Sequence, residues 1–132
     1  SIPFYDLKKA NELYKEEISL SLNRILSSGW YIMGEELESF EKNFAKYCGT
    51  KFCIGVGNGL DALKIILKSY KELGFINDFD EIIVPANTYI ATILSILDCN
   101  LKPILVEPDI KTYNIDPLKI EKSITNKTKA II

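Results

Sequence analysis

Histidine is absent from all 132 residues of this chain. Without histidine the chain cannot build a Ser-His-Asp triad, a Cys-His pair or a His-ligated metal site. Any chemistry must therefore use carboxylates, lysines or a bound cofactor. Strong charge of one sign is also absent, since the formal net charge is −2 and no basic block occurs. This excludes the electrostatic footprint of nucleic-acid binding, and we expect no nucleic-acid partner.

Long apolar runs and paired cysteines are missing as well. No run approaches the roughly 20 apolar residues that span a bilayer, and residues 1–6 lack the features of a signal peptide. The cysteines Cys48, Cys53 and Cys99 are odd in number and form no CxxC, which argues against a disulfide framework or a zinc knuckle. We expect a cytoplasmic protein without membrane or metal partners, whose three thiols are reduced and mostly buried.

The first fifty residues predict two helices. The first covers about residues 7–28 and stops at Gly29, and the second opens at Glu35 and stops at Gly49. An aromatic bridge, residues 30–34, joins them. Apolar residues recur at helical spacing and predict one buried face on each helix. For the first helix they are Tyr14, Ile18, Leu22, Ile25 and Leu26, and for the second Leu37, Phe40, Phe44 and Tyr47.

From residue 51 onward, strand and helix patterns alternate. Strands are predicted at 52–56, 81–84, 103–106 and 129–132, with helices at about 60–73, at 88–97 and after Asp116. This alternation predicts an α/β fold in which helices surround a mostly parallel sheet. The last apolar run ends without a cap or a turn, so we expect a fragment of a longer chain. A complete small domain with a C-terminal edge strand is the alternative.

A glycine-rich turn, Gly55 to Asp61, follows the first predicted strand and opens a helix. Its amides and the positive helix end suit a phosphate. An ordinary strand-to-helix turn is the competing interpretation. A dinucleotide fingerprint fits poorly because Leu60 stands at the third glycine position, and no GK[ST] follows as a P-loop requires.

Two further segments carry candidate ligand-binding residues. In residues 85–92, Tyr89 is expected either to place its ring against a flat heterocycle or to pack beneath a helix capped by Thr88. In residues 107–116, paired acids suggest acid–base or metal chemistry, and a solvated turn with Asp116 as helix cap is the favoured alternative. Trp30 and Tyr31 are candidates for ligand contact, interface contact or buried packing.

Several motifs in register resemble the DegT/DnrJ/EryC1/StrS family of sugar aminotransferases. The resemblance covers essentially the whole chain and is closest to members that aminate dTDP-3-keto-6-deoxyhexoses. It implies the aspartate-aminotransferase (fold type I) architecture. Residues 1–34 would form an N-terminal helix and aromatic bridge, and residues 35–132 the first part of the cofactor-binding large domain. The motifs are Ile2-Pro3-Phe4-x-Asp6-Leu7, Ser28-Gly29-Trp30-Tyr31-Ile32-x-Gly34, Phe40-Glu41-x-x-Phe44-Ala45-x-Tyr47-Cys48-Gly49, Gly57-Asn58-Gly59-Leu60-Asp61-Ala62-Leu63, Val84-Pro85-Ala86-Asn87-Thr88-Tyr89-Ile90-Ala91-Thr92 and Thr112-Tyr113-Asn114-Ile115-Asp116.

The resemblance implies pyridoxal 5′-phosphate (PLP, or its amine form PMP) as cofactor. Gly59 and Leu60 would offer amides to its phosphate, although Leu60 lacks the hydroxyl that many relatives have there. Asn58 and Asp61 would order the turn, and the Asp61 carboxylate would also repel a phosphate. Tyr89 would stack on the pyridine ring. Residues 30–31 would lie near the substrate entrance and a homodimer contact.

The resemblance also implies what the chain lacks. The acidic partner of the pyridine nitrogen and the Schiff-base lysine would lie beyond residue 132, so no catalytic residue is expected within it. The implied activity transfers an amino group, commonly from glutamate, to a keto group of a dTDP-linked deoxyhexose, with C3 favoured over C4. The alternatives are a PLP- or PMP-dependent sugar dehydratase of the same superfamily and a non-catalytic phosphate-binding α/β module.

Overall fold

A computed structural model of the chain describes residues 3–132. Ser1 and Ile2, and with them the first residue of the N-terminal motif, lie outside the described residues. The chain forms two compact units, Ser1–Gly55 and Val56–Ile132. Within residues 3–132, no helix combines the length and the apolar character needed to cross a membrane.

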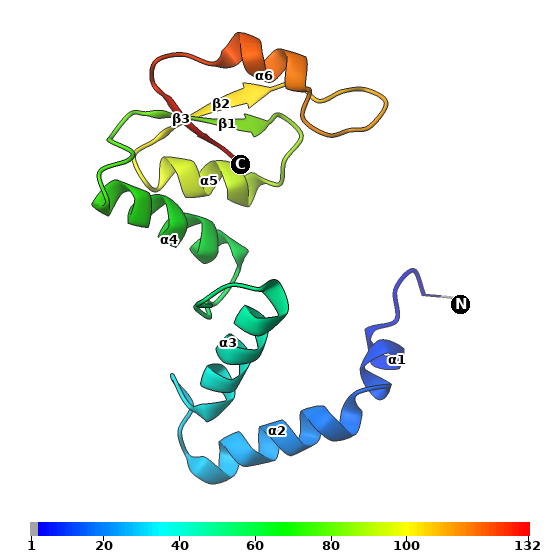
Figure 1. Cartoon of the computed structure of the whole chain (residues 1–132). Coiled ribbons are helices and arrows are strands. Elements are labelled where there is room, and N and C mark those ends of the chain that lie inside the picture. Colours follow the sequence, from blue (N-terminus) through cyan, green and yellow to red (C-terminus); the bar gives the residue numbers. More distant parts are fainter. Residues whose placement is uncertain (1–2) are drawn as a thin grey trace. The chain divides into compact units, whose positions relative to one another are not determined.

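The first unit consists of helices α1 (Leu7–Glu12), α2 (Lys15–Ser28) and α3 (Glu35–Cys48) (Figure 1). The prediction of one helix over residues 7–28 was wrong, because the chain breaks between α1 and α2. Tyr14 leaves the helical conformation at φ −118° and ψ 10°, and its N–H donates to the Asn11 carbonyl in a tighter turn at 3.1 Å. The apolar repeat begins only at Tyr14, so α1 has no apolar stripe in phase with α2.

Both predicted glycine stops are confirmed. Gly29 ends α2 at φ 65° and Gly49 ends α3 at φ 69°, in the left-handed region that a side chain disfavours. At its start, α3 carries Glu35, Glu36 and Glu38, where acidic charge complements the helix dipole.

The prediction of buried helix faces in the first unit was wrong. Ala45 is the one buried hydrophobic residue of its described part, while Phe44 is 46% and Tyr47 86% exposed. Phe40 and Phe44 stack on each other with ring centroids 5.4 Å apart. The apolar stripes have the predicted spacing, but the described part of this unit contains no element that covers them.

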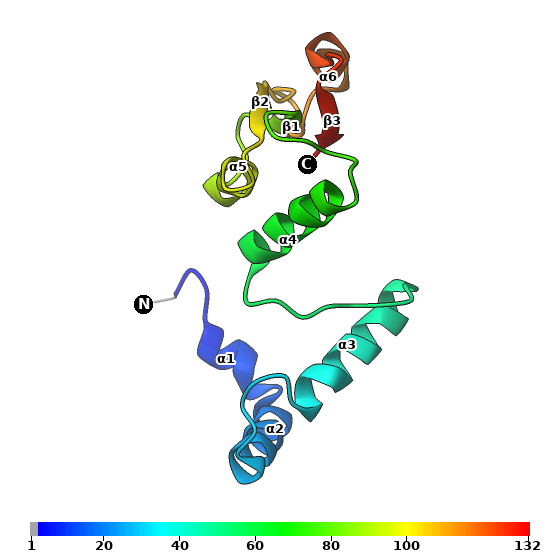
Figure 2. The same cartoon turned by 90° about the vertical axis from the view of Figure 1, so that its left-hand side faces the viewer.

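The second unit is built on a three-stranded parallel sheet. Its elements in chain order are α4 (Gly59–Glu72), β1 (Glu81–Pro85), α5 (Ile90–Leu97), β2 (Lys102–Val106), α6 (Pro117–Ser123) and β3 (Thr128–Ile131). The strand order is β2-β1-β3, and Ile83 of β1 pairs with Ile104 and Ile131. Helices α4 and α5 lie on one side of the sheet and α6 on the other (Figures 1 and 2). This confirms the predicted α/β arrangement.

The predicted strand at residues 52–56 is the main error in this region. Residues 52–56 belong to no strand, and Phe52 and Ile54 are each 74% exposed. A strand requires a neighbour to complete its hydrogen-bond ladder, and none of the described residues provides one. The Gly55 N–H instead donates to the Glu41 carboxylate of α3 at 2.7 Å.

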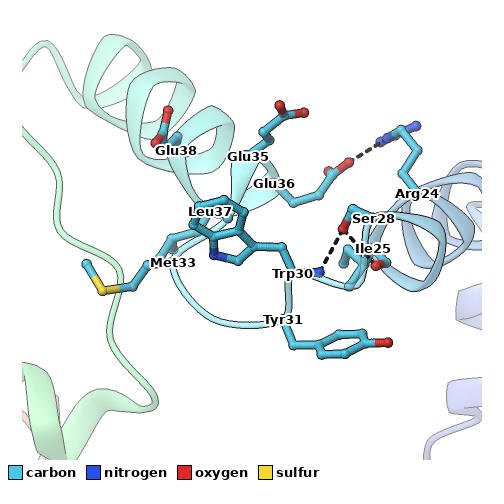
Figure 3. Close-up of a pocket in the computed structure, with 11 residues that line it drawn as sticks. Arg24, Ile25, Ser28, Trp30, Tyr31, Met33, Glu35, Glu36, Leu37 and Glu38 are labelled. Carbon is cyan, nitrogen blue, oxygen red and sulfur yellow. Dashed lines mark hydrogen bonds and ion pairs between the residues drawn. The ribbon is translucent and has the colours of Figure 1, made fainter.

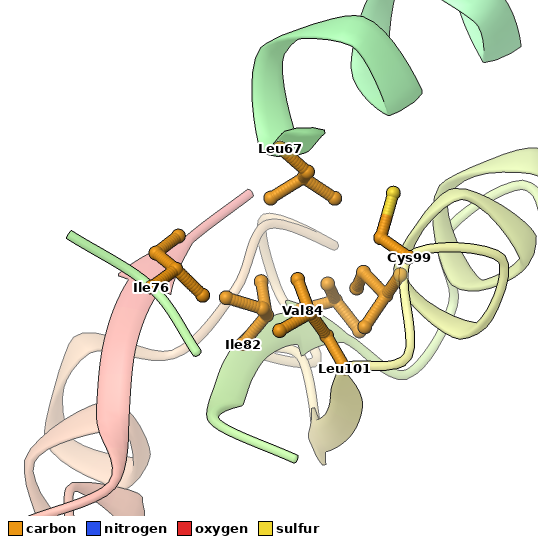
Figure 4. Packing of buried hydrophobic residues seen from close by; sticks show 7 residues of the cluster. Leu67, Ile76, Ile82, Val84, Cys99 and Leu101 are labelled. Atoms are coloured by element: carbon orange, nitrogen blue, oxygen red, sulfur yellow. The ribbon is translucent and has the colours of Figure 1, made fainter. Parts of the chain in front are cut away.

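The core of the second unit lies around β1, which is shielded on both faces. Ile82, Ile83 and Val84 are fully buried. Figure 4 shows the cluster that Ile82 and Val84 form with residues of α4, α5 and the adjoining loops: Leu67, Ile76, Ile96, Cys99 and Leu101. Cys99 is thus a buried thiol as predicted, whereas Cys48 is exposed and Cys53 half-buried. The expectation of mostly buried thiols was wrong for these two, because they lie in the first unit, which has little core.

Glu81, the first residue of β1, is bonded to β2 and to the turn that precedes β3. Its carboxylate accepts hydrogen bonds from the Thr125 hydroxyl at 2.6 Å and from the Lys102 ammonium at 3.1 Å. Its backbone N–H donates to the Lys127 carbonyl at 2.9 Å. The Thr125 hydroxyl and, next, Lys102 hold the pKa of Glu81 below its ordinary value.

Candidate functional site

The candidate site lies at the end of the sheet opposite Glu81. Figure 1 shows that α4 and α5 both begin on the side where β1 and β2 end. Open parallel sheets bind their ligands at the carboxyl ends of the strands. Helices that begin there also direct the positive ends of their dipoles to the same edge. The site is therefore formed by the starts of two helices and the loops that follow β1 and β2.

The start of α4 is closed by a reciprocal pair of hydrogen bonds. The Asn58 side-chain oxygen accepts from the Asp61 N–H at 2.9 Å, and the Asn58 amide donates to the Asp61 carboxylate at 2.9 Å. Asn58 is extended, at φ −166° and ψ 174°, as an N-cap residue should be. Both hydrogen bonds lie within the turn, so the two side chains lock each other in place.

The amides of Gly59 and Leu60 remain available for a ligand. The first amides of a helix have no acceptor within the helix, and no described residue accepts from either of these two. A Cβ built on Gly59 meets nothing within 4 Å, whereas one on Gly57 would lie 3.3 Å from the Asp61 carboxylate. The turn thus offers two free donors and open space at a positive helix end, which suits an anion such as phosphate.

Tyr89 lies immediately before α5 and is 79% exposed. The interpretation of Tyr89 as a packing residue is therefore wrong within this chain. Thr88 is not the helix cap either: its hydroxyl donates to the Thr92 hydroxyl at 3.0 Å, and Tyr89 occupies the cap position without a side-chain cap bond. The Tyr89 backbone is fixed by its neighbours, while its aromatic faces stay free.

The loop after β2, residues 107–116, is a closed turn. Asp109 accepts hydrogen bonds from the amides of Lys111 and Thr112 at 3.0 and 2.9 Å, and the Thr112 amide and then the Lys111 amide lower the pKa of Asp109. Asp116 caps α6 by accepting from the Leu118 amide at 3.0 Å. The favoured interpretation of a turn with Asp116 as cap is confirmed. A carboxylate bonded to two amides of its own turn is a poor acid or base.

One contact in this region had no signal in the sequence. The Asn87 side-chain amide, in the loop after β1, donates to the Tyr113 carbonyl at 3.0 Å. It joins the two loops that follow adjacent strands. Tyr113 itself has a positive φ of 58°. Only the parallel pairing of β1 with β2 brings these positions together, and a one-dimensional pattern does not contain that information.

Lys64 and Asp98 tie α4 to α5 beside the core. Their charged groups lie 2.8 Å apart, with the lysine side chain 29% exposed. The hydrogen bond to Asp98 raises the pKa of Lys64. Lys64 is therefore a charged structural residue in this arrangement and not a poised base.

The predicted contact residues Trp30 and Tyr31 lie in the first unit, at an open groove of about 700 Å³ between the end of α2 and the start of α3 (Figure 3). The Trp30 indole donates to the Ile32 carbonyl at 2.6 Å, and Tyr31 points away from the indole. Both residues are about two-thirds exposed, at 68% and 66%. Arg24 and Glu36 form an ion pair at 2.5 Å on the same groove.

Within residues 3–132, no three or more acidic or cysteine side chains converge in a way that could hold a metal ion. The polar groups of the carboxyl edge are instead amides, an exposed ring and hydrogen-bonded side chains.

Comparison with known proteins places these features in a family. The chain is 58% identical over 131 residues to the dTDP-3-amino-3,6-dideoxy-alpha-D-galactopyranose transaminase of Aneurinibacillus thermoaerophilus, covering 99% of this chain and 35% of that protein. The structure of S. venezuelae DesV in complex with a ketimine intermediate matches with a TM-score of 0.88 at 43% identity, over 98% of this chain and 34% of that one.

A dehydratase matches less well. The structure of GDP-4-keto-6-deoxymannose-3-dehydratase with a trapped PLP-glutamate geminal diamine has a TM-score of 0.78 at 28% identity, over 99% of this chain and 32% of that one. The chain spans about a third of the length of these relatives.

These matches agree with the α/β architecture, and the fold is that of the first part of a fold type I aminotransferase. The family profile of the DegT/DnrJ/EryC1/StrS aminotransferases matches residues 12–132, and the chain therefore belongs to the DegT/DnrJ/EryC1/StrS aminotransferase family.

Proposed function

We propose that the chain belongs to a PLP-dependent sugar aminotransferase. The enzyme would transfer an amino group from an amino acid to a keto group of a dTDP-linked deoxyhexose. The observation that carries this proposal is the pair of free amides at the start of α4, Gly59 and Leu60, on the same edge of the sheet as the exposed ring of Tyr89. A phosphate site and an aromatic platform are what a phosphorylated pyridine needs.

The residues present fit this cofactor. Gly59 and Leu60 would hold the phosphate through their amides, while Asn58 and Asp61 keep those amides in place. Tyr89 would cover one face of the pyridine ring. When bound, PLP supplies an electron sink for amino-group transfer between an amino acid and a ketone. The Asp61 carboxylate is held on Asn58, which limits its repulsion of the phosphate.

The sugar nucleotide is proposed from the similarity to a named relative. The transaminase from Aneurinibacillus thermoaerophilus is named for a dTDP-3-amino-3,6-dideoxyhexose, which favours a dTDP-linked 3-keto sugar here. Glutamate is the proposed amino donor, and the dehydratase structure that holds a trapped PLP-glutamate geminal diamine supports it. Trp30 and Tyr31, exposed at their groove, are proposed to contact this substrate.

The proposal includes the setting of the reaction. The enzyme would act in deoxyamino-sugar biosynthesis as a cytoplasmic homodimer. The exposed apolar stripe of α2, with Ile18, Leu22 and Leu26 between 44% and 64% exposed, supports a subunit contact because monomers rarely expose such stripes. We also retain the proposed division into an N-terminal helix and aromatic bridge at 1–34 and part of the large domain at 35–132.

The test is transfer of labelled nitrogen. The protein, expressed from its complete reading frame, is incubated with PLP, nitrogen-labelled glutamate and a dTDP-3-keto-6-deoxyhexose, and the products are analysed by mass spectrometry. The proposal predicts a dTDP-amino sugar that carries the label. A sugar that has lost a hydroxyl and carries no label would identify the dehydratase alternative. No turnover and no bound cofactor would contradict the proposal and favour the non-catalytic phosphate-binding module.

A further inference from the structure

We propose that Asn87 is a positioning residue for Tyr89. Its side-chain amide would fasten the loop after β2 to the loop after β1 and thereby fix the backbone from which the Tyr89 ring meets the cofactor. This inference rests on the proposed function, because it assumes that Tyr89 stacks on a PLP or PMP ring. The carrying observation is the 3.0 Å hydrogen bond from the Asn87 amide to the Tyr113 carbonyl.

The segment that carries Tyr89 is short and restrained at three points. Before it, the Thr88 amide donates to the Pro85 carbonyl at 3.1 Å and closes a turn around Asn87. After it, the Thr92 amide donates to the Tyr89 carbonyl at 3.0 Å. The Thr88 and Thr92 hydroxyls bond across it. These contacts are local. Among residues 3–132, Asn87 supplies the one side-chain hydrogen bond from this turn to a different loop.

The loop that receives the Asn87 amide is stiff enough to act as an anchor. The Tyr113 N–H donates to the Asp109 carbonyl at 2.8 Å, and the Asp109 N–H donates to the Asn114 carbonyl at 2.9 Å. An isolated bridge pairs Pro108 with Ile115 across the base of the loop. A hydrogen bond to a mobile loop would restrain Asn87 little. A hydrogen bond to a loop closed by its own contacts holds Asn87 in one position.

The backbone at the contact is also unusual. Tyr113 has a φ of 58°, in the left-handed region that bulky residues avoid, and the residue is 68% exposed. Such strain persists only where surrounding contacts determine it. The two-way bonding of Tyr113, N–H to Asp109 and carbonyl to Asn87, provides those contacts and aims the carbonyl at the turn before Tyr89.

The test is a double-mutant cycle between Asn87 and Tyr89. It uses apo-protein expressed from the complete reading frame and PMP as the probe, because PMP has no aldehyde to react with surface lysines. Dissociation constants come from calorimetry, and near-ultraviolet circular dichroism of bound PMP reports how its ring is held. The variants are Asn87→Ala, the isosteric Asn87→Asp, Tyr89→Ala and the double variant Asn87→Ala/Tyr89→Ala. Thr112→Val is the matched control, since it removes a bond internal to the second loop, from the Asn114 amide at 3.3 Å.

We expect Tyr89→Ala to weaken PMP binding about tenfold or more, as loss of ring stacking does. Asn87→Ala and Asn87→Asp should weaken it several-fold and change the dichroism of bound PMP, while Thr112→Val leaves both unchanged. In the Tyr89→Ala background, Asn87→Ala should have no further effect, because its action passes through the ring.

Two results overturn the inference in distinguishable ways. In the first, Tyr89→Ala weakens PMP binding, but Asn87→Ala either has no effect or weakens binding equally with and without the Tyr89 ring. Asn87 then does not position Tyr89, and the proposed function stands. If Tyr89→Ala leaves PMP binding unchanged, the stacking assignment fails, and the positioning role fails with it.

Discussion

Replacing Asn58 with alanine should loosen the first turn of α4 while the rest of the fold stays intact. The change removes the acceptor of the Asp61 N–H and the donor to the Asp61 carboxylate, each at 2.9 Å. Loss of an N-cap costs about 1 kcal/mol, and an exposed hydrogen bond adds about 0.5 kcal/mol. We therefore expect Asn58→Ala to lower the free energy of unfolding by about 1–2 kcal/mol.

The same change should weaken cofactor binding. Without Asn58, the first turn no longer holds the Gly59 and Leu60 amides in fixed directions, and the Asp61 carboxylate is free to face the phosphate. About 1.4 kcal/mol corresponds to tenfold in affinity, so we expect PMP to bind roughly tenfold more weakly. Asn58→Ser is the matched control, because a serine oxygen can still cap the helix, and most of the affinity should return.

The assays are urea unfolding followed by circular dichroism and PMP titration by calorimetry. If Asn58→Ala lowers the stability while PMP binds with unchanged affinity, the α4 turn does not hold the phosphate. If Asn58→Ser loses as much stability and as much PMP affinity as Asn58→Ala, the cap is not what orders the turn. The reasoning from these two hydrogen bonds is then refuted.

Three further predictions concern the fold. Ile96→Ala, at a fully buried site, should lower the free energy of unfolding by about 2–5 kcal/mol and Ile96→Val by about 0.5–1.5 kcal/mol; equal losses in urea titrations would contradict the packing account. The pKa of Glu81 is held below its ordinary value of 4.5, first by the Thr125 hydroxyl, so its stabilisation is full above that value and is lost as the pH falls through the lowered pKa. The free energy of unfolding of Glu81→Gln should thus depend less on pH than that of the wild type in this acidic range. Parallel curves of unfolding free energy against pH would refute this. Gly49→Ala, at φ +69° with nothing near the added Cβ, should lower the free energy of unfolding by about 1 kcal/mol because of backbone strain. Gly59→Ala, outside the left-handed region, should not lower the thermal midpoint of unfolding. An equal fall of the midpoint for both variants would argue against strain.

Local signals in the sequence predict much of the second unit. The compact apolar run at 81–84 became the buried strand β1, and the Asp116-Pro117 pair became the capped start of α6. Asn58 and Gly59 likewise mark the start of α4. Each of these signals is decided by residues within a few positions, through capping, proline geometry or a short apolar run, so tertiary context had little to override.

Where the predictions failed, a distant partner or a local break decided the outcome. The apolar run at 52–56 has the composition of a strand but has no neighbour among the described residues, and composition does not reveal pairing. The break at Tyr14 has no glycine or proline to announce it. The Asn87–Tyr113 bond joins positions 26 residues apart, which become neighbours only through the register of β1 with β2.

The central claim is that the amides of Gly59 and Leu60 hold the cofactor phosphate, and their amide resonances test it most directly. The protein from the complete reading frame, labelled with nitrogen isotope at glycine and leucine, is titrated with PMP. The account predicts large, saturable shifts of the Gly59 and Leu60 amides, with the Gly49 amide in the first unit as an unshifted reference. Saturating PMP binding that leaves the Gly59 and Leu60 resonances in place would contradict the account.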